Sequence, residues 1–227
     1  MLGNEQNKQA HQHYAMQLCI PIDNININGI KTQSAVFIDS DVTHFVSSDA
    51  DILSFWFHPE SIIGRKLKQD YFQAEKIVTL HEIDVQKYVK NVSAKIDQKS
   101  AIEKSTVNIL NKFFIDDTEI PPLDSRIEEI ILHIDQTEPA HLDYDALVSQ
   151  VFLSKSRLTD LFKKEIGTSI TKYLLWKRLL HTSVDLVKSD MTFTQAAHQS
   201  GFADAAHFSR TFKTNFGIDP RTIFTKD

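Results

Sequence analysis

One stretch of the sequence occurs twice: Ser154-Lys-Ser-Arg-Leu-Thr-Asp-Leu-Phe-Lys-Lys-Glu-Ile-Gly167 and, 50 residues later, Asp204-Ala-Ala-His-Phe-Ser-Arg-Thr-Phe-Lys-Thr-Asn-Phe-Gly217. Each copy begins with a residue that caps helices, because the side chains of Ser154 and Asp204 can accept hydrogen bonds from the first free backbone N–H groups. Each copy ends with a glycine, the residue that adopts the left-handed conformation of a helix stop at least cost. The repeat therefore predicts two copies of one short capped helix, over residues 155–166 and 205–216.

Both predicted helices have an apolar face and a polar face. Apolar residues recur at i, i+4 and i+8 in both copies: Leu158, Phe162 and Ile166, and Phe208, Phe212 and Phe216. A shorter helix, over 144–150 and 194–199, and a tight turn precede the two copies. This layout is typical of the helix-turn-helix, whose second helix enters the major groove of DNA. A bundle of amphipathic helices is the alternative, but it leaves the duplicated caps, stops and turn spacing unexplained.

The charge of the chain is distributed unevenly. The formal net charge is −5, which for the whole chain argues against a polyanionic partner. Residues 1–125 carry 12 basic and 17 acidic side chains, whereas residues 126–227 carry 13 of each. Residues 154–181 carry seven basic and two acidic side chains. The acidic surplus therefore lies outside the predicted DNA-binding half, and the argument against DNA fails locally.

A longer set of residues surrounds the repeat. It comprises Gly201-Phe202, His207-Phe208-Ser209-Arg210, Phe212-Lys213, Phe216-Gly217 and Pro220 and, around the first copy, Ser154, Leu158, Phe162-Lys163, Gly167, Tyr173 and Arg178. With these residues, the stretch from about Leu142 to Phe224 resembles the DNA-binding domain of the AraC/XylS family of bacterial transcription regulators. The resemblance implies two helix-turn-helix units joined by a long helix over 170–188, with both recognition helices in adjacent major grooves about one turn (~34 Å) apart.

The resemblance also implies which side chains meet DNA. The residues expected to read bases are Ser156, Thr159, Asp160, Ala205, Ala206, His207 and Arg210. The residues expected to contact phosphates are Ser154, Lys155, Lys163, Lys164, Lys172, Lys213 and Arg221. Arg210 can serve either purpose. Among the departures from the family pattern, Phe152 stands where the first turn usually has glycine, and Ala205 and Ala206 can contact only a thymine methyl group.

The N-terminal half has a different pattern. Short strands are expected over 15–20, 25–30, 34–38, 43–46 and 52–57, with Asn28-Gly29 as a tight hairpin turn. From residue 84 the period becomes helical, and helices over 84–96 and 102–114 can pair as a hairpin or form a dimer interface. Two acidic residues and Pro121-Pro122 interrupt the helical pattern and mark a boundary. We therefore expect an α+β protein with domains 1–120 and 121–227, the second all-helical.

Three histidines stand near the predicted strands. The sequence from His11 to Gln17, followed by His44, resembles the start of a cupin-like β-barrel, and this implies that residues 1–120 form a sensing and dimerisation domain. We expect His11, His13, Gln17, His44 and Trp56 to line an effector pocket. Metal binding by the three imidazoles is a competing interpretation, but glutamine is a poor metal ligand, so no metal or cofactor is expected.

These features predict a sequence-specific regulator, an activator, that binds promoter or operator DNA. RNA polymerase, a small-molecule effector and a second copy of the chain are its expected partners. The single cysteine, Cys19, and the lack of a signal peptide or membrane span favour the cytoplasm. No enzymatic activity is expected. A metal-dependent cupin enzyme with an accessory helical domain is the alternative function, which bound metal together with turnover would support.

Overall fold

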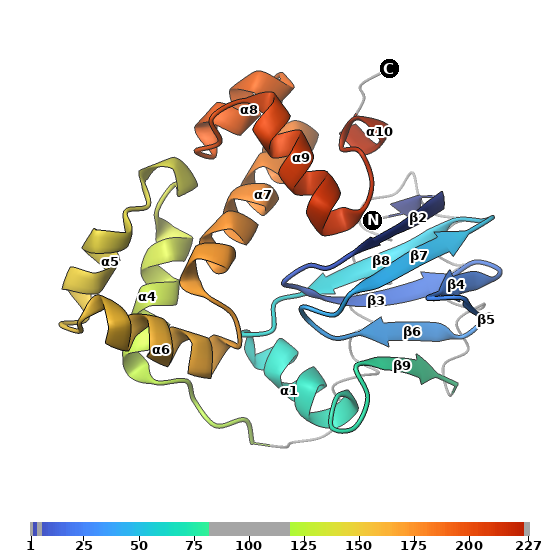
Figure 1. Cartoon of the computed structure of the whole chain (residues 1–227), viewed down its shortest axis with the longest axis horizontal. Helices are drawn as coiled ribbons and strands as arrows, with labels where there is room; N and C mark the ends of the chain where they lie inside the picture. Colours follow the sequence, from blue (N-terminus) through green and yellow to red (C-terminus); the bar gives the residue numbers. More distant parts are fainter. Residues whose placement is uncertain (1, 4–5, 82–118, 225–227) are drawn as a thin grey trace. The chain divides into compact units, whose positions relative to one another are not determined.

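The structure is a computed structural model that describes residues 2–3, 6–81 and 119–224 (Figure 1). The chain divides into two compact units, Met1–Ile120 and Pro121–Asp227. The first unit contains antiparallel sheets and the second is helical, so the protein is α+β. The helices expected over 84–96 and 102–114 lie outside the described residues.

The first unit contains two antiparallel sheets. One sheet has the strand order β1-β8-β3-β6-β9 and the other has the order β2-β7-β4-β5. The strands are β1 (Leu2–Gly3), β2 (Gln6–His11), β3 (Met16–Pro21), β4 (Ile25–Ile27), β5 (Ile30–Thr32), β6 (Ala35–Ile38), β7 (His44–Ser48), β8 (Ile52–Phe57) and β9 (Ile77–Leu80). Because the described strands form two separate sheets, the cupin-like barrel stays a prediction.

Strand β3 is buried on both faces, which explains why its residues are apolar except for Gln17. Met16, Leu18 and Ile20 pack in one cluster with Leu67 of helix α1 (Ile62–Tyr71). Cys19, on the other face, packs with residues of both sheets, among them Ile25, Val36 and Val46. The five-stranded sheet therefore lies between α1 and the four-stranded sheet. Gln17 has the same parity as Cys19 and faces the four-stranded sheet.

The expected hairpin turn is confirmed at Asn28 and Gly29. Their φ angles are 51° and 90°, the two positive values of a tight turn whose twist matches the flanking strands. The side chain of Asn26 accepts a hydrogen bond from the Gly29 backbone N–H at 2.8 Å. The turn fixes the register in which Ile27 pairs with Ile30.

The second unit consists of helices joined by short turns. They are α4 (Ser125–Gln136), the 3₁₀ helix η1 (Pro139–His141), α5 (Tyr144–Gln150), α6 (Lys155–Ile166), α7 (Ile170–Lys188), α8 (Phe193–Gln199), α9 (Ala205–Phe216) and α10 (Arg221–Phe224). Leu158, Phe162, Tyr173, Phe208 and Phe212 are buried at its centre. Among the described helices, none combines the length and apolar character needed to cross a membrane.

Candidate nucleic-acid interface

The two repeated helices have the predicted ends. The Ser154 hydroxyl accepts from the Arg157 backbone N–H at 3.3 Å, and an Asp204 carboxylate oxygen accepts from the His207 N–H at 2.6 Å. Gly167 and Gly217 end the helices with φ of 85° and 71°. The prediction of two equivalent capped helices, α6 and α9, is therefore confirmed.

The turns before α6 and α9 differ in length and chemistry. Four residues, 151–154, separate α5 from α6, whereas five residues, 200–204, separate α8 from α9. Gly201 takes a φ of 81° in the second turn, and in the first turn Phe152 takes a φ of 52°. A Cβ at Gly201 would lie 3.0 Å from the Ala140 Cα, so this turn is closely packed. Phe152 is 96% exposed, which gives its side chain room that the second turn lacks.

Helix α7 packs against both repeated helices. Near its N-terminus the Tyr173 ring lies edge-on to Phe162 of α6, with centroids 5.4 Å apart. Three residues later the Trp176 ring lies 5.5 Å from that of Phe216 of α9. Figure 1 shows α7 running from the α5–α6 pair to the α8–α9 pair. One helix of 19 residues, about 28 Å long, thus fixes the position of one helix-turn-helix relative to the other.

The residues expected to read bases on α6 lie on its polar face, but they are not equally available. Ser156 and Asp160 are exposed. Thr159 is half-buried, and its hydroxyl lies 2.8 Å from the Tyr144 hydroxyl and donates to the Lys155 carbonyl at 2.8 Å. Tyr144 of α5 was not among the sequence candidates, although it precedes Thr159 by 15 residues in the same repeat unit.

On α9 the corresponding face is more open. Ala206, His207 and Arg210 are exposed, and Ala205 is half-buried. The His207 ring packs perpendicular to that of Phe202, with centroids 5.2 Å apart, so the preceding turn orients this side chain. On this face His207 and Arg210 therefore differ in freedom: the His207 ring is held against Phe202, and Arg210 extends into solvent.

The residues expected to contact phosphates fall into two groups. Lys155 lies 2.6 Å from Asp145 of α5, whose hydrogen bond raises the pKa of the lysine, and Lys164 lies 3.7 Å from Glu165. The second group is exposed, and within the described ranges no carboxylate lies within 4.0 Å of its ammonium or guanidinium groups. It consists of Lys163, Lys172, Lys213 and Arg221. Ser154 is also exposed, but its hydroxyl is engaged as the cap of α6.

The histidines of the expected effector pocket do come together in the first unit. His11 pairs in register with His44 across β2 and β7, with ring centroids 4.4 Å apart. The His13 ring lies 5.0 Å from that of His44 and 4.4 Å from that of Trp56 on β8. His13 Nε2 lies 3.2 Å from Gln17 Oε1. The cluster therefore bridges the two sheets, and all three histidines and Gln17 are buried.

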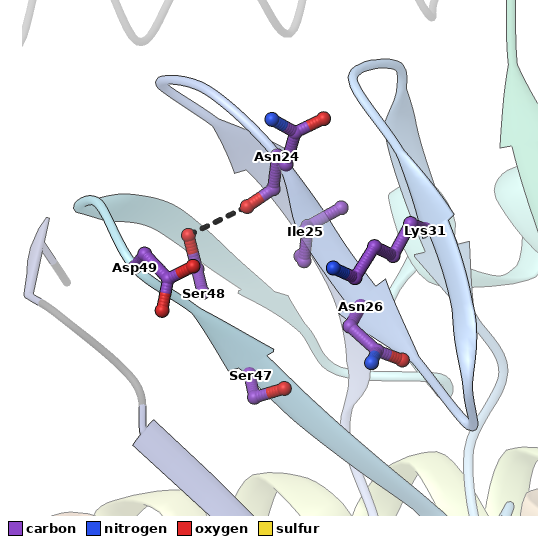
Figure 2. Close-up of a pocket in the computed structure, with 7 residues that line it drawn as sticks. All are labelled: Asn24, Ile25, Asn26, Lys31, Ser47, Ser48 and Asp49. Atoms are coloured by element: carbon purple, nitrogen blue, oxygen red, sulfur yellow. Dashed lines mark hydrogen bonds between the residues drawn. The ribbon is translucent and has the colours of Figure 1, made fainter.

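A cavity of about 490 Å³ lies elsewhere in the first unit (Figure 2). Asn26, Lys31 and Ser47 come from three neighbouring strands, which Figure 2 shows side by side, and they are paired across β5, β4 and β7. Its remaining lining is Asn24, Ile25, Ser48 and Asp49. This polar, surface-open cavity is not formed by the clustered histidines.

Comparisons with known proteins agree with this geometry. Residues 147–226 match a family model described as a helix-turn-helix domain. The arabinose operon regulatory protein of Salmonella typhimurium is 32% identical over 101 residues, which are 44% of this chain and 36% of that protein. The chain thus matches about a third of the length of this curated relative.

The fold is similar to that of a solved protein along nearly the whole chain. Apo ToxT from Vibrio cholerae superposes with a TM-score of 0.65 and 12% identity, covering 99% of this chain and 95% of that one. ToxT solved with a bound unsaturated fatty acid gives a TM-score of 0.55 and 13% identity, covering 99% and 97%. The two capped helices, their joining helix and these matches support one assignment: residues 147–226 are a helix-turn-helix domain similar to that of the arabinose operon regulatory protein, in agreement with the resemblance to the AraC/XylS family.

Proposed function

We propose that the protein is a sequence-specific, DNA-binding transcription regulator that inserts α6 and α9 into two adjacent major grooves on one face of the duplex. The observation that carries the proposal is the duplication: two helices with equivalent caps and stops, each with an exposed polar face, are held by the single helix α7. Recognition helices that read successive turns must be spaced by about 34 Å, and a rigid connection between them maintains such a spacing.

Base reading is proposed for the exposed polar side chains of the two helices. On α9, His207 and Arg210 can donate hydrogen bonds to acceptors in the major groove, and Ala206 can contact a thymine methyl group. On α6, Ser156 can hydrogen-bond to any base edge and Asp160 can accept from cytosine N4. Thr159 is given a lesser role, because Tyr144 already binds its hydroxyl.

Phosphate contacts are proposed mainly for the basic residues that lack a nearby carboxylate in the described part of the chain. Lys163 and Lys213 occupy equivalent places in the last turns of α6 and α9, and Lys172 lies in the first turn of α7. Such contacts position the protein without reading sequence. Lys155 and Lys164 have to leave Asp145 and Glu165 before they can bind DNA, which lowers their net contribution.

Regulation by a small molecule bound to the first unit is part of the proposal. ToxT, whose fold covers 99% of this chain, has been solved with an unsaturated fatty acid, and this supports an effector site in a chain of the same fold. The clustered histidines with Gln17 and Trp56 remain one candidate site, and the polar cavity in Figure 2 is another. Promoter activation through RNA polymerase and a homodimeric state complete the proposal.

Selection of bound sequences from a random pool of double-stranded DNA tests the function directly. The expected product is a bipartite site whose two conserved blocks are about one helical turn apart, one block for each recognition helix. Enrichment of no sequence would contradict specific binding. A reporter gene placed behind the selected site then gives the sign of regulation, because expression rises with an activator and falls with a repressor.

A further inference from the structure

The turn between α8 and α9 is attached to helix α7 through polar side chains. His181 and Asp185 lie four residues apart on α7, and Ser200 is the first residue after α8. His181 Nδ1 lies 3.2 Å from the Ser200 hydroxyl and 3.1 Å from Asp185 Oδ2. Ser200 is fully buried, whereas the two side chains of α7 are partly exposed. These three residues, the α7–turn bridge, therefore join the helix between the two recognition units to the turn of the second unit.

The carboxylate of the bridge determines the direction of the hydrogen bond. Asp185 Oδ2 is buried and accepts no hydrogen bond of good geometry from the residues that the structure describes. A lone pair on His181 Nδ1 would face the lone pairs of this oxygen, which is unfavourable, so Nδ1 carries the proton. His181 therefore donates to the Ser200 hydroxyl, and the nearby carboxylate strengthens the donor electrostatically.

The turn itself leaves Ser200 little room to move. The backbone N–H groups of Ser200 and Phe202 donate to carbonyls of α8 at 3.2 and 2.9 Å. A Cβ at Gly201 would lie 3.4 Å from Arg178 Nε, so the turn lies close against α7. Because the turn is bonded to α8 and packed on α7, a displacement of Ser200 would carry Phe202 with it.

Phe202 connects this turn with a residue proposed to read a base. Its ring is buried, perpendicular to that of His207 at a centroid distance of 5.2 Å, and 5.5 Å from that of Phe208 in the core. A side chain that recognises a ligand has to be held in place by the residues that pack around it. The contacts thus run from His181 through Ser200 and Phe202 to His207.

The first helix-turn-helix supports its recognition helix in another way. There the Tyr144 hydroxyl lies 2.8 Å from the hydroxyl of Thr159, on the recognition helix itself. The side chain of Phe152, in the turn, is 96% exposed. A change at the α7–turn bridge should therefore affect the reading of DNA by α9 and leave the reading by α6 intact.

We propose that His181 is a positioning residue for the second recognition helix: its hydrogen bond to Ser200, supported by Asp185, sets the orientation from which His207 reads DNA. The inference rests on the proposed DNA-binding function and adds to it a determinant of specificity that lies outside both recognition helices. His181 acts through the turn and not by contact with a base.

The test is sequence selection from random double-stranded DNA with the full wild-type chain and with His181→Ala. The variant is expected to lose base preference in the block read by α9 and to keep the block read by α6. Its affinity for the wild-type site should fall about 2- to 10-fold, the range for one hydrogen bond. His181→Asn, whose amide N–H replaces the Nδ1 donor, should restore both. His198→Ala, which removes an exposed histidine of α8, is the matched control.

Ser200→Ala and the double variant test the route of the effect. The double variant should bind no more weakly than His181→Ala alone, because both changes remove the same hydrogen bond. Additive losses, or equal weakening of both DNA blocks, contradict the proposal and indicate a general loss of stability. If His181→Ala does not fold by circular dichroism, Ser200→Ala decides in its place.

The outcome for the wild type separates this proposal from the proposed function. A wild-type chain that selects a bipartite site, together with an unchanged α9 block in folded His181→Ala, overturns the positioning role alone. A wild-type chain that enriches no sequence overturns both the positioning role and specific DNA binding.

Discussion

Phe152 is an aromatic residue in a backbone conformation that favours glycine. Its φ of 52° places the Cβ close to its own backbone, which costs about 1–2 kcal/mol for an L-residue, while its ring is 96% exposed and gains little from packing. Gly201 occupies the equivalent position of the second turn without this strain. The strained backbone of Phe152 at the first turn is therefore a local cost to stability.

We expect Phe152→Gly to raise the free energy of unfolding by roughly 1 kcal/mol, because it relieves the strain at a smaller entropic cost. Phe152→Ala is the matched variant: it removes the same ring but retains a Cβ, and it should leave stability nearly unchanged. Urea denaturation of the three proteins measures the difference. Equal stabilisation by both substitutions would attribute the effect to the exposed ring and contradict the backbone argument.

Arg210 provides the sharpest test of base reading. It extends from α9 into solvent, and Arg210→Ala is expected to weaken binding to the selected site by about 1–3 kcal/mol, roughly 5- to 150-fold. Loss of a base contact relaxes the preference at one position, whereas loss of a phosphate contact weakens all sequences equally. Repeating the sequence selection with the variant separates the two possibilities. Lys188→Ala, which removes an exposed cation at the C-terminal end of α7 that is not among the proposed contacts, is the control.

Glu60 is a buried carboxylate with two partners in the first unit. Its Oε2 accepts from the Tyr14 hydroxyl at 2.7 Å and its Oε1 lies 3.1 Å from His58 Nδ1. Burial raises the pKa of Glu60, but the hydrogen bond and charge of His58 and the hydrogen bond of Tyr14 outweigh it and lower the pKa from 4.5 to about 2. The folded protein therefore holds this carboxylate ionised more strongly than the unfolded chain does.

The sign of the pH dependence follows from that difference. Stabilisation by Glu60 is complete above pH 4.5 and is lost as the pH falls towards 2, since the unfolded chain takes up the proton first. A pKa difference of this size corresponds to about 3 kcal/mol. We expect Glu60→Gln to destabilise the protein at pH 7 and to differ less from the wild type at pH 3. Chemical denaturation at both pH values gives the comparison; an unchanged difference would refute the linkage.

At the scale of the element, the N-cap of α9 connects stability with DNA binding. Asp204 accepts from the His207 backbone N–H, which together with nearby Arg210 keeps the pKa of the aspartate low, and it lies at the end of α9 that would face the duplex. Its carboxylate stabilises the helix but repels phosphates. Asparagine retains the capping oxygen without the charge.

Asp204→Asn and Asp204→Ala should therefore have different effects. Asparagine is expected to keep the melting temperature and to strengthen DNA binding at low salt, because a negative charge is removed. Alanine removes the cap, so we expect a lower melting temperature together with weaker binding through a frayed first turn of α9. Thermal unfolding and fluorescence anisotropy on the same DNA provide both readouts, and a lower melting temperature for the asparagine variant would contradict the capping argument.

The elements that could be predicted from sequence are those with local signals at both ends. Helices α5, α6, α7 and α9 have the expected bounds: all four begin after a polar cap, and α6 and α9 also end at a glycine, signals that can be read within a few residues. Strand β2 and helix α1 were missed. β2 consists largely of polar residues, so it lacks the pattern of a buried strand. The sequence of α1 is charged and does not indicate its buried face, on which even Lys66 lies. β2 is positioned by its pairing with β7, and α1 is positioned by its packing against β3.

The histidine cluster shows the same limit for sites. His13 and His44 are 31 residues apart in sequence, and they meet because β2 and β7 pair with an irregularity in register between Asn7 and His11. No local pattern specifies that irregularity. Sequence proposed the members of the cluster, but the direction of each Nε2 depends on backbone carbonyls that only the folded chain brings into place.

For the whole molecule, charge is separated between the two halves of the sequence. Residues 1–125 hold the entire surplus of acidic side chains, and residues 126–227 are balanced. DNA binding therefore cannot rely on a large net positive charge. It depends on a few cations on the recognition helices and α7, so the non-specific affinity should be modest and should fall with salt at a slope set by the number of those cations.

The contribution of these few cations to DNA binding can be measured from the salt dependence of the affinity. Each phosphate contact contributes about −0.9 to the slope of log K against log salt concentration, so loss of Lys163, Lys172 and Lys213 together should reduce the slope by about 3. Lys155→Ala should change it less, because Asp145 already pairs with Lys155 at 2.6 Å. Anisotropy titrations over a range of salt concentrations measure both. If Lys155→Ala changes the slope as much as any one of the other lysines, the pairing with Asp145 does not persist on DNA and the division of the basic residues into two groups is wrong.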